Sequence, residues 1–220
     1  MSKQRPRDII KEQHERSSLE EALELLNRKK GCDFRIIERP DPPDAIISDG
    51  TSYSWMEYVD AFRTEDEARE LLTHVTPGEI PYQRKEQLIE SPDKRIVDSI
   101  ICKMRYKLGK TTYRPSFEKY GKGILIIGVQ DPLFSEMSFT FVEEKLIKIY
   151  DSLKQYWLDL GYFREVYLKF RLSFWVKCGL MQIYPTLESW IVPKNVKSEE
   201  MFLLEKKMNI LWSSYLEKGV

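Results

Sequence analysis

The stretch from Phe34 to Asp60 restricts the possible folds more than any other part of the chain, and it reads FRIIERPDPPDAIISDGTSYSWMEYVD. Its opening apolar run is followed by three prolines, which cannot donate hydrogen bonds inside a sheet, so a first strand ends there. A second strand is predicted to begin at Asp44, and Asp49-Gly50 is typical of a hairpin turn. Residues 51–59 are then predicted to form a third strand, antiparallel to the second.

Two carboxylates of this stretch are predicted to lie close together. Side chains alternate between the two faces of a strand, so Glu57 shares a face with Trp55 and Val59. Asp44 lies on the neighbouring antiparallel strand. Carboxylate oxygens are the hard ligands that Mg²⁺ prefers. Asp44 and Glu57 are therefore predicted to form half of a metal site.

This arrangement resembles the PD-(D/E)XK nuclease superfamily, in which Pro-Asp opens one strand, Glu-x-Lys lies on the next, and both carboxylates bind a divalent metal. Pro43-Asp44 and Glu57-Tyr58-Val59 occupy these places, and the resemblance covers roughly residues 17–130. It implies an α/β fold with a restriction-endonuclease-like core of one helix, three antiparallel strands, a helix and a further strand in a mixed sheet. Val59 stands where the family has a lysine that orients the attacking water or stabilises developing charge.

The resemblance also implies a function and a set of site residues. It implies a phosphodiesterase that cleaves DNA or RNA, with one or two Mg²⁺ or Mn²⁺ ions held by Asp44, Glu57 and Glu38. Related nucleases supply a further carboxylate from the first helix, where Glu21 is the candidate. The alternative is an inactive module of the same fold that binds nucleic acid or a protein partner, and Val59 is the residue that favours it.

A lysine from elsewhere in the chain is a candidate to replace the one missing at Val59. Ser91-Pro92 is a typical helix start, and a buried apolar stripe follows it at helical spacing. Lys103 and Lys107 lie along the margin of that stripe, within reach of the sheet. Some members of the superfamily carry their functional lysine on this helix. The other interpretation is a basic helix edge that contacts phosphate or only water.

The distribution of charge agrees with either reading of the site. The formal net charge is zero, but residues 33–90 hold fourteen acidic against six basic side chains. Residues 94–122 then hold nine basic against two acidic side chains. A metal-dependent nuclease needs carboxylates for the cation and positive charge for the phosphates. Solvated surfaces produce similar runs, so the pattern alone does not decide the function.

We expect residues 1–16 to form a loosely docked arm and residues 17–220 a single domain, elaborated from about residue 135. The first helix is expected to begin at the capping box Ser18-Leu19-Glu20-Glu21 and to end at Gly31. No apolar run approaches the roughly 18 residues of a membrane span, and no signal-peptide core follows the start. We therefore expect a cytoplasmic protein with no membrane partner.

The remaining elements are predicted from periodicity. Residues 123–129 are almost entirely apolar and indicate a strand buried on both faces, which follows a helix and so implies a mixed sheet. Asp131-Pro132 after it is read as a turn, and His74 as an ordinary helix residue. Further predictions are a loop at 76–90 that is a candidate flap, a helix at 139–160, strands at 166–170, 172–176 and 181–184, and a last helix from Ser198. The apolar face of that last helix either covers the sheet or pairs with another copy, which makes a homodimer possible.

Overall fold

The computed structural model describes residues 5–80, 82–83, 91–131, 134–172, 177–185 and 188–193. Within them lie five α-helices, one short 3-10 turn and seven strands. In chain order these are α1 Pro6–Lys30, β1 Arg35–Glu38, β2 Ala45–Ser48, β3 Tyr53–Ala61, α2 Glu65–Val75, α3 Pro92–Leu108, η1 Thr111–Tyr113, α4 Arg114–Tyr120, β4 Gly123–Val129, α5 Glu136–Leu160, β5 Phe163–Leu172, β6 Lys177–Tyr184 and β7 Glu188–Pro193.

The strands form one mixed sheet in which spatial order follows sequence order, from β1 to β7. β1, β2 and β3 are antiparallel, β3, β4 and β5 are parallel, and β6 and β7 continue the sheet in antiparallel fashion. The predicted α/β class, the three antiparallel strands and the mixed sheet are therefore confirmed.

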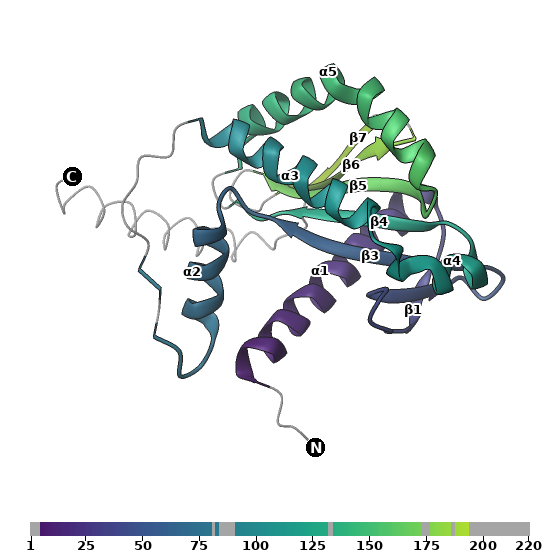
Figure 1. Ribbon diagram of the computed structural model, residues 1–220, viewed down its shortest axis with the longest axis horizontal. Coiled ribbons are helices and arrows are strands. Elements are labelled where there is room, and N and C mark those ends of the chain that lie inside the picture. The colour runs from purple at the N-terminus through teal and green to yellow at the C-terminus, as the bar shows by residue number, and fades with distance from the viewer. Residues whose placement is uncertain are drawn as a thin grey trace.

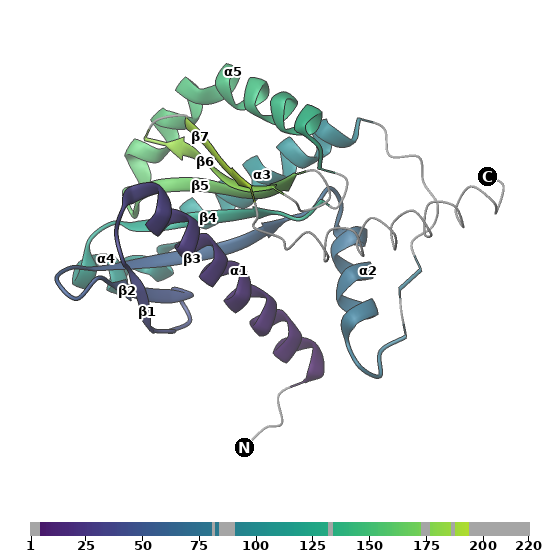
Figure 2. The same ribbon diagram turned by 180° about the vertical axis from the view of Figure 1, so that it is seen from behind.

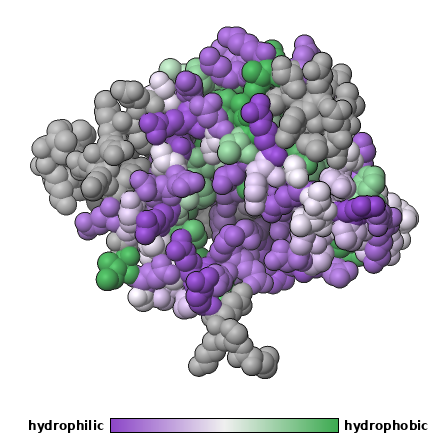
Figure 3. All heavy atoms as spheres, in the orientation of Figure 1, coloured by the Kyte–Doolittle hydropathy of each residue, from purple (hydrophilic) through white to green (hydrophobic). Residues whose placement is uncertain are grey.

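Helices cover both faces of the sheet, and each face has its own core. Figure 1 shows α3 and α5 over one face, and Figure 2 shows α1 crossing the other. On the α3 side Trp55, Leu125 and Leu168 are buried together with Ile100. On the α1 side Leu19 and its helix neighbours pack against side chains of β2, β3, β4, β5 and β6. The face seen in Figure 3 is mainly hydrophilic, with hydrophobic side chains gathered where α3 and α5 meet. No helix in the described ranges is long and apolar enough to cross a membrane.

The prediction that residues 1–16 form a loose arm was wrong for the part that the structure describes, because α1 begins at Pro6 rather than at Ser18. Proline at the first helical position has its backbone angle already set for a helix and lacks only an N–H that would be unpaired there. The first half of α1 has no apolar stripe because it lies over a polar cavity instead of the core. Its His14 and Glu15 are both partly buried.

Some other element boundaries also differ from the predictions, although β4 has the predicted bounds. Leu172 ends β5, and the rest of the strand expected at 172–176 lies outside the described residues. α5 begins at Glu136, three residues before the predicted start. The expected helix from Ser198, and with it the proposed homodimer contact, lies outside the described residues, as do residues 81 and 84–90 of the expected flap.

Gly128 in β4 is required by its contact with Tyr58, and replacing it with alanine is expected to destabilise the fold. A Cβ atom at this position would lie 1.9 Å from the Tyr58 hydroxyl. That hydroxyl donates to Asp60 at 2.6 Å and so is not free to move aside. We expect Gly128→Ala to lower the free energy of unfolding by about 2 kcal/mol, measured by urea denaturation. Gly109→Ala is the control, because its nearest contact would be 3.4 Å, and an equal loss in both variants would contradict the explanation.

Candidate active site

Asp44 and Glu57 face one another across the β2–β3 pair. The register pairs Ala45 with Met56, so the next positions outward are Asp44 and Glu57. Residues directly opposite one another in an antiparallel pair project from the same face of the sheet. The Asp44 carboxylate also accepts a hydrogen bond of 2.6 Å from the backbone N–H of Tyr58. The spatial pairing of these two carboxylates is therefore as the sequence predicts.

A cavity of about 620 Å³ opens beside this pair. It lies where β2 begins, beyond which β3 continues to Ala61 paired only with β4. The first half of α1, the segment before Asp44 and the end of α3 surround it. The lining side chains are mostly charged, and they come from Asp8, Lys11, Glu12, Glu15, Arg16, Arg39, Pro40, Asp41, Pro42, Asp44, Glu57, Lys107, Lys110 and Thr112.

Lys107 reaches this cavity from the last turn of α3 and pairs with Glu57. Its Nζ contacts Glu57 Oε1, and the two side chains are only 12% and 3% exposed. Tyr113, from the turn η1, donates a hydrogen bond of 2.9 Å to the same oxygen. The other carboxylate oxygen, Oε2, is buried and has no hydrogen-bond partner in the described part of the chain. Glu57 Oε1 is thus held by two donors, whereas Oε2 has no hydrogen-bond partner among the described residues.

Burial, together with the nearby charge of Glu57, raises the pKa of Asp44 to about 7. The hydrogen bond from Tyr58 and the charge of Lys107 act in the opposite direction without cancelling this effect. Near neutral pH the Asp44 carboxyl is therefore close to the midpoint of its titration. Any cation placed between the two carboxylates would stabilise the charged form of both.

The structure separates the two candidate lysines. Lys107 lies in the site, whereas Lys103 is one turn away and does not line the cavity. Val59 follows Glu57 on the same face of β3, is partly buried and packs against the core on the α3 side. Val59 therefore supplies no ammonium group from β3. The Lys107 ammonium approaches the Glu57 carboxylate from α3 instead.

The other two predicted carboxylates lie elsewhere. Glu38 is exposed at the end of β1 and does not line the cavity. Its strand pairs with β2 with an irregularity just before this residue, between Ile36 and Glu38. Glu21 lies on the α1 face of the sheet, where it pairs with Lys169 and Arg171 of β5.

Two residues of the site were missed in the sequence. Glu15 lines the cavity from α1, and burial raises its pKa. It was missed because the helix was expected to begin at Ser18. The spacing of Lys11 and Glu15, which form an i,i+4 ion pair of 3.6 Å, is one signal of an earlier start. Tyr113 follows α3 in a short turn without any periodic pattern. No signal in the sequence indicates its contact with Glu57.

Removing the Tyr113 hydroxyl is expected to loosen Glu57 without unfolding the protein. Tyr113→Phe deletes one hydrogen bond to a carboxylate but keeps the ring, which stacks on Trp55 at a centroid distance of 5.4 Å. We expect the free energy of unfolding to fall by about 1–2 kcal/mol in urea denaturation. Tyr53→Phe, at an exposed ring stacked on Tyr120, is the control. A loss no larger than that of the control would show that the hydrogen bond adds nothing.

Comparisons of this chain with protein-family models, with curated proteins and with solved structures find no match. The site must therefore be interpreted from its own geometry. Within the ranges that the structure describes, no three His, Cys, Asp or Glu side chains converge closely enough to hold a metal by themselves. Two carboxylates are nevertheless enough for Mg²⁺, which usually keeps several waters and binds through one or two protein carboxylates.

Proposed function

We propose that this chain is a metal-dependent phosphodiesterase with a restriction-endonuclease-like core, which cleaves DNA or RNA. The observation that carries the proposal is the contact between Lys107 and Glu57. In the PD-(D/E)XK pattern a lysine ammonium lies beside the second carboxylate, but this chain has Val59 at the lysine position. α3 brings a lysine to that carboxylate from a different element. The carboxylates of Asp44 and Glu57 and the ammonium of Lys107 therefore line one cavity.

Asp44 and Glu57 would hold Mg²⁺ or Mn²⁺. The fit is supported by the buried and unpartnered Oε2 of Glu57 and by the raised pKa of Asp44, because both are relieved by a cation. A divalent cation bound there supplies the Lewis-acid charge that phosphodiester hydrolysis needs. Glu15 on α1 also lines the cavity, and its charge contributes to the raised pKa of Asp44. Glu38 is not part of this proposed set, because it is outside the cavity.

The basic residues of the cavity would bind and orient the nucleic-acid backbone. Lys107 is held by Glu57 and would place positive charge where negative charge develops on the phosphate. Four further basic side chains line the same cavity: Lys11 and Arg16 on α1, Arg39 before β2 and Lys110 after α3. Binding through such contacts weakens as salt concentration rises, since it depends on releasing counterions from the phosphates.

The test is cleavage of labelled DNA and RNA, single- and double-stranded, in Mg²⁺ and in Mn²⁺. We expect the wild-type protein to cleave at least one substrate, and EDTA to stop it. Glu57→Gln is expected to reduce the rate by about 10³-fold or more. Glu38→Gln is the matched control, because it removes a strand carboxylate outside the cavity, and its rate should be unchanged. Cleavage that survives in Glu57→Gln would overturn the proposal.

A second candidate function is a binding module of the same fold without chemistry. The observation that favours it is that Lys107 and Tyr113 both contact Glu57 Oε1, which satisfies this oxygen without a cation. This candidate predicts salt-sensitive retention of nucleic acid in EDTA with no cleavage in any metal. Lys110→Ala, which removes a basic group at the cavity wall, would then weaken retention while Lys103→Ala would not.

A further inference from the structure

An exposed tyrosine lies beside the cavity that contains Asp44 and Glu57. Tyr106 is in the last turn of α3, which Figure 1 shows over the sheet, and the residue is 60% exposed. Lys110 Nζ lies 4.7 Å from the centroid of the Tyr106 ring, and Lys110 lines the cavity. The Tyr106 ring is therefore open to a ligand at the edge of the proposed nuclease site.

Tyr106 also lies within electrostatic range of the residues that hold Glu57. Burial is the main cause of the raised pKa of Tyr113, and smaller contributions come from Glu57, Asp44 and Tyr106. The Tyr113 hydroxyl in turn donates to Glu57 at 2.9 Å. The next residue after Tyr106 is Lys107, which contacts the same carboxylate. A ligand on the Tyr106 ring would therefore lie close to the proposed point of cleavage.

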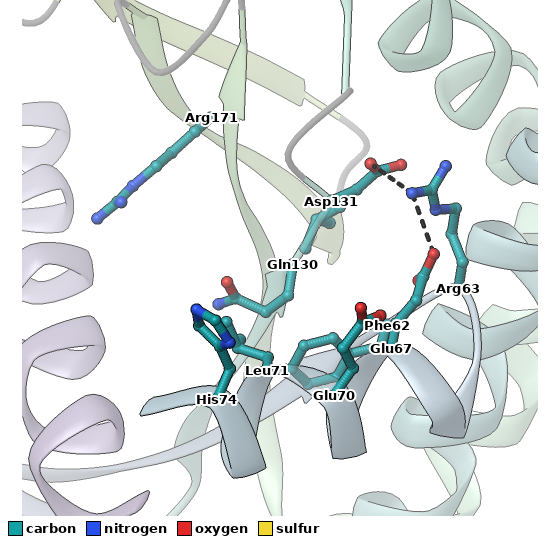
Figure 4. Close-up of a pocket in the computed structure, with 10 residues that line it drawn as sticks. Phe62, Arg63, Glu67, Glu70, Leu71, His74, Gln130, Asp131 and Arg171 are labelled. Atoms are coloured by element: carbon teal, nitrogen blue, oxygen red, sulfur yellow. Dashed lines mark ion pairs between the residues drawn. The ribbon is translucent and has the colours of Figure 1, made fainter. Parts of the chain in front are cut away.

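Lys110 differs from the other basic side chains of this cavity, because it has no carboxylate partner within the described residues. The others are all paired: Lys107 with Glu57, Lys11 with Glu15, and both Arg16 and Arg39 with Glu20. Arg63 is paired as well, beside a cavity of about 430 Å³ at the carboxyl ends of β3 and β4. Figure 4 shows it held by Glu67 at 3.0 Å and by Asp131 at 3.5 Å. The Lys110 ammonium contacts an aromatic ring instead, which leaves its N–H donors free for a phosphate.

A groove of about 520 Å³ lies along α3 next to the Tyr106 ring. Its described lining residues are Asp98, Ile101, Cys102, Arg105 and Tyr106. Asp98 and Arg105 carry opposite charges, so these residues have no net charge. A groove with an aromatic wall and no net charge suits a nucleobase better than a phosphate. Tyr106 therefore joins a surface for a base to the cation beside it that can bind a phosphate.

We propose that Tyr106 stacks on a base of a single-stranded nucleic acid while Lys110 binds the adjoining phosphate, so that the strand enters the cavity beside Glu57. This assignment rests on the proposed nuclease function and narrows its substrate to single strands. The bases of a single strand are free to stack on an aromatic side chain, whatever their sequence. A base inside a duplex is already stacked on its neighbours, and it must be unstacked before it can reach Tyr106.

The test is a fluorescence anisotropy titration of the full chain in EDTA, with labelled oligonucleotides of about 12 nucleotides in DNA and in RNA form. Three probes are compared: a single strand, its duplex, and an abasic strand of the same length. We expect the single strand to bind about tenfold tighter than the other two. Tyr106→Ala should weaken binding of the single strand about tenfold and leave binding of the abasic strand unchanged. Tyr106→Phe keeps the ring and should bind as the wild type does.

Tyr53→Ala is the matched control, because Tyr53 is 56% exposed but lines neither the cavity nor the groove. Its binding of the single strand should equal that of the wild type. The proposal is overturned if no strand binds, if the duplex binds as tightly as the single strand, or if Tyr106→Ala binds the single strand as tightly as the wild type. It is also overturned if Tyr106→Ala loses affinity for the abasic strand to the same extent, since a folding defect would then explain the loss. A dimer in sedimentation that Tyr106→Ala dissociates would assign the ring to a second copy of the chain instead.

Failure of this assignment can be told apart from failure of the nuclease function, because EDTA prevents metal-dependent cleavage during the titration. Cleavage of the same probes is then measured separately in Mg²⁺ and Mn²⁺. Binding that depends on Tyr106 without any cleavage would contradict the nuclease function and retain the stacking role. Cleavage of single strands that Tyr106→Ala performs with an unchanged KM would contradict the stacking role and retain the nuclease function.

Discussion

Replacing Lys107 with methionine is expected to reduce the proposed cleavage rate by about 10²–10³-fold, because it removes the ammonium that Glu57 holds in the cavity. The methionine side chain keeps much of the length and apolar stem of lysine, so loss of packing is small. Glu57 is only 3% exposed and loses its counterion, so the free energy of unfolding should also fall by about 3 kcal/mol. Single-turnover cleavage and urea denaturation measure the two effects.

Lys103→Met is the matched control for this prediction, since it lies one turn earlier on α3 and outside the cavity. It should retain both the rate and the stability of the wild type. Adding Val59→Lys to Lys107→Met is expected to recover part of the rate, because it places an ammonium at the strand position of the PD-(D/E)XK pattern. Equal losses in Lys103→Met and Lys107→Met would contradict the assigned role of Lys107.

Asp44→Asn is expected to stabilise the protein at pH 8 while it abolishes cleavage. The pKa of Asp44 is about 7 in the folded protein against an ordinary value of 3.8, so the unfolded chain loses this proton first as pH rises. The stability that protonated Asp44 contributes is therefore complete below about pH 4 and is lost between about pH 4 and pH 7. Asparagine stays neutral at every pH and can still accept the hydrogen bond from Tyr58.

The expected gain in unfolding free energy at pH 8 is about 2–4 kcal/mol, shrinking to near zero at pH 4. Urea denaturation of both proteins at pH 4, 6 and 8, without divalent cations, measures it. Asp49→Asn is not expected to gain stability with rising pH, because hydrogen bonds from Thr51 and Ser52 hold the pKa of Asp49 below its usual range. A difference between Asp44→Asn and wild type that does not change with pH would contradict the raised pKa.

The carboxylate pair was predictable because it depends on local pattern alone. The prolines before Asp44 and the turn at Asp49-Gly50 determine where both strands begin, and the hairpin register then places Asp44 opposite Glu57. The buried strand 123–129 was predictable for a similar reason, since an apolar run of that length between glycines has few alternatives. The antiparallel start and the parallel centre of the sheet follow from these elements.

The choice between Lys103 and Lys107 needed tertiary structure. Both lie along the same margin of α3, and helical periodicity gives their angle around the axis but not which turn stands over Glu57. That depends on how far α3 slides along the sheet, which the packing of Ile100 and Met104 determines. Glu15 was missed for a different reason: a helix over a polar cavity needs no apolar stripe, and periodicity is the signal by which helices are found.

The most direct test of the site is a calorimetric titration of Mn²⁺, in buffers with different heats of ionisation. If Asp44 and Glu57 hold the cation, the wild type should bind Mn²⁺ and release a proton from Asp44 at pH 6.5, with less proton release at pH 8.5. Glu57→Gln should lose this binding, and Glu38→Gln should retain it with the same proton release. Absence of binding to the wild type, or binding to Glu57→Gln with the same affinity and proton release, would contradict a metal site at these two carboxylates.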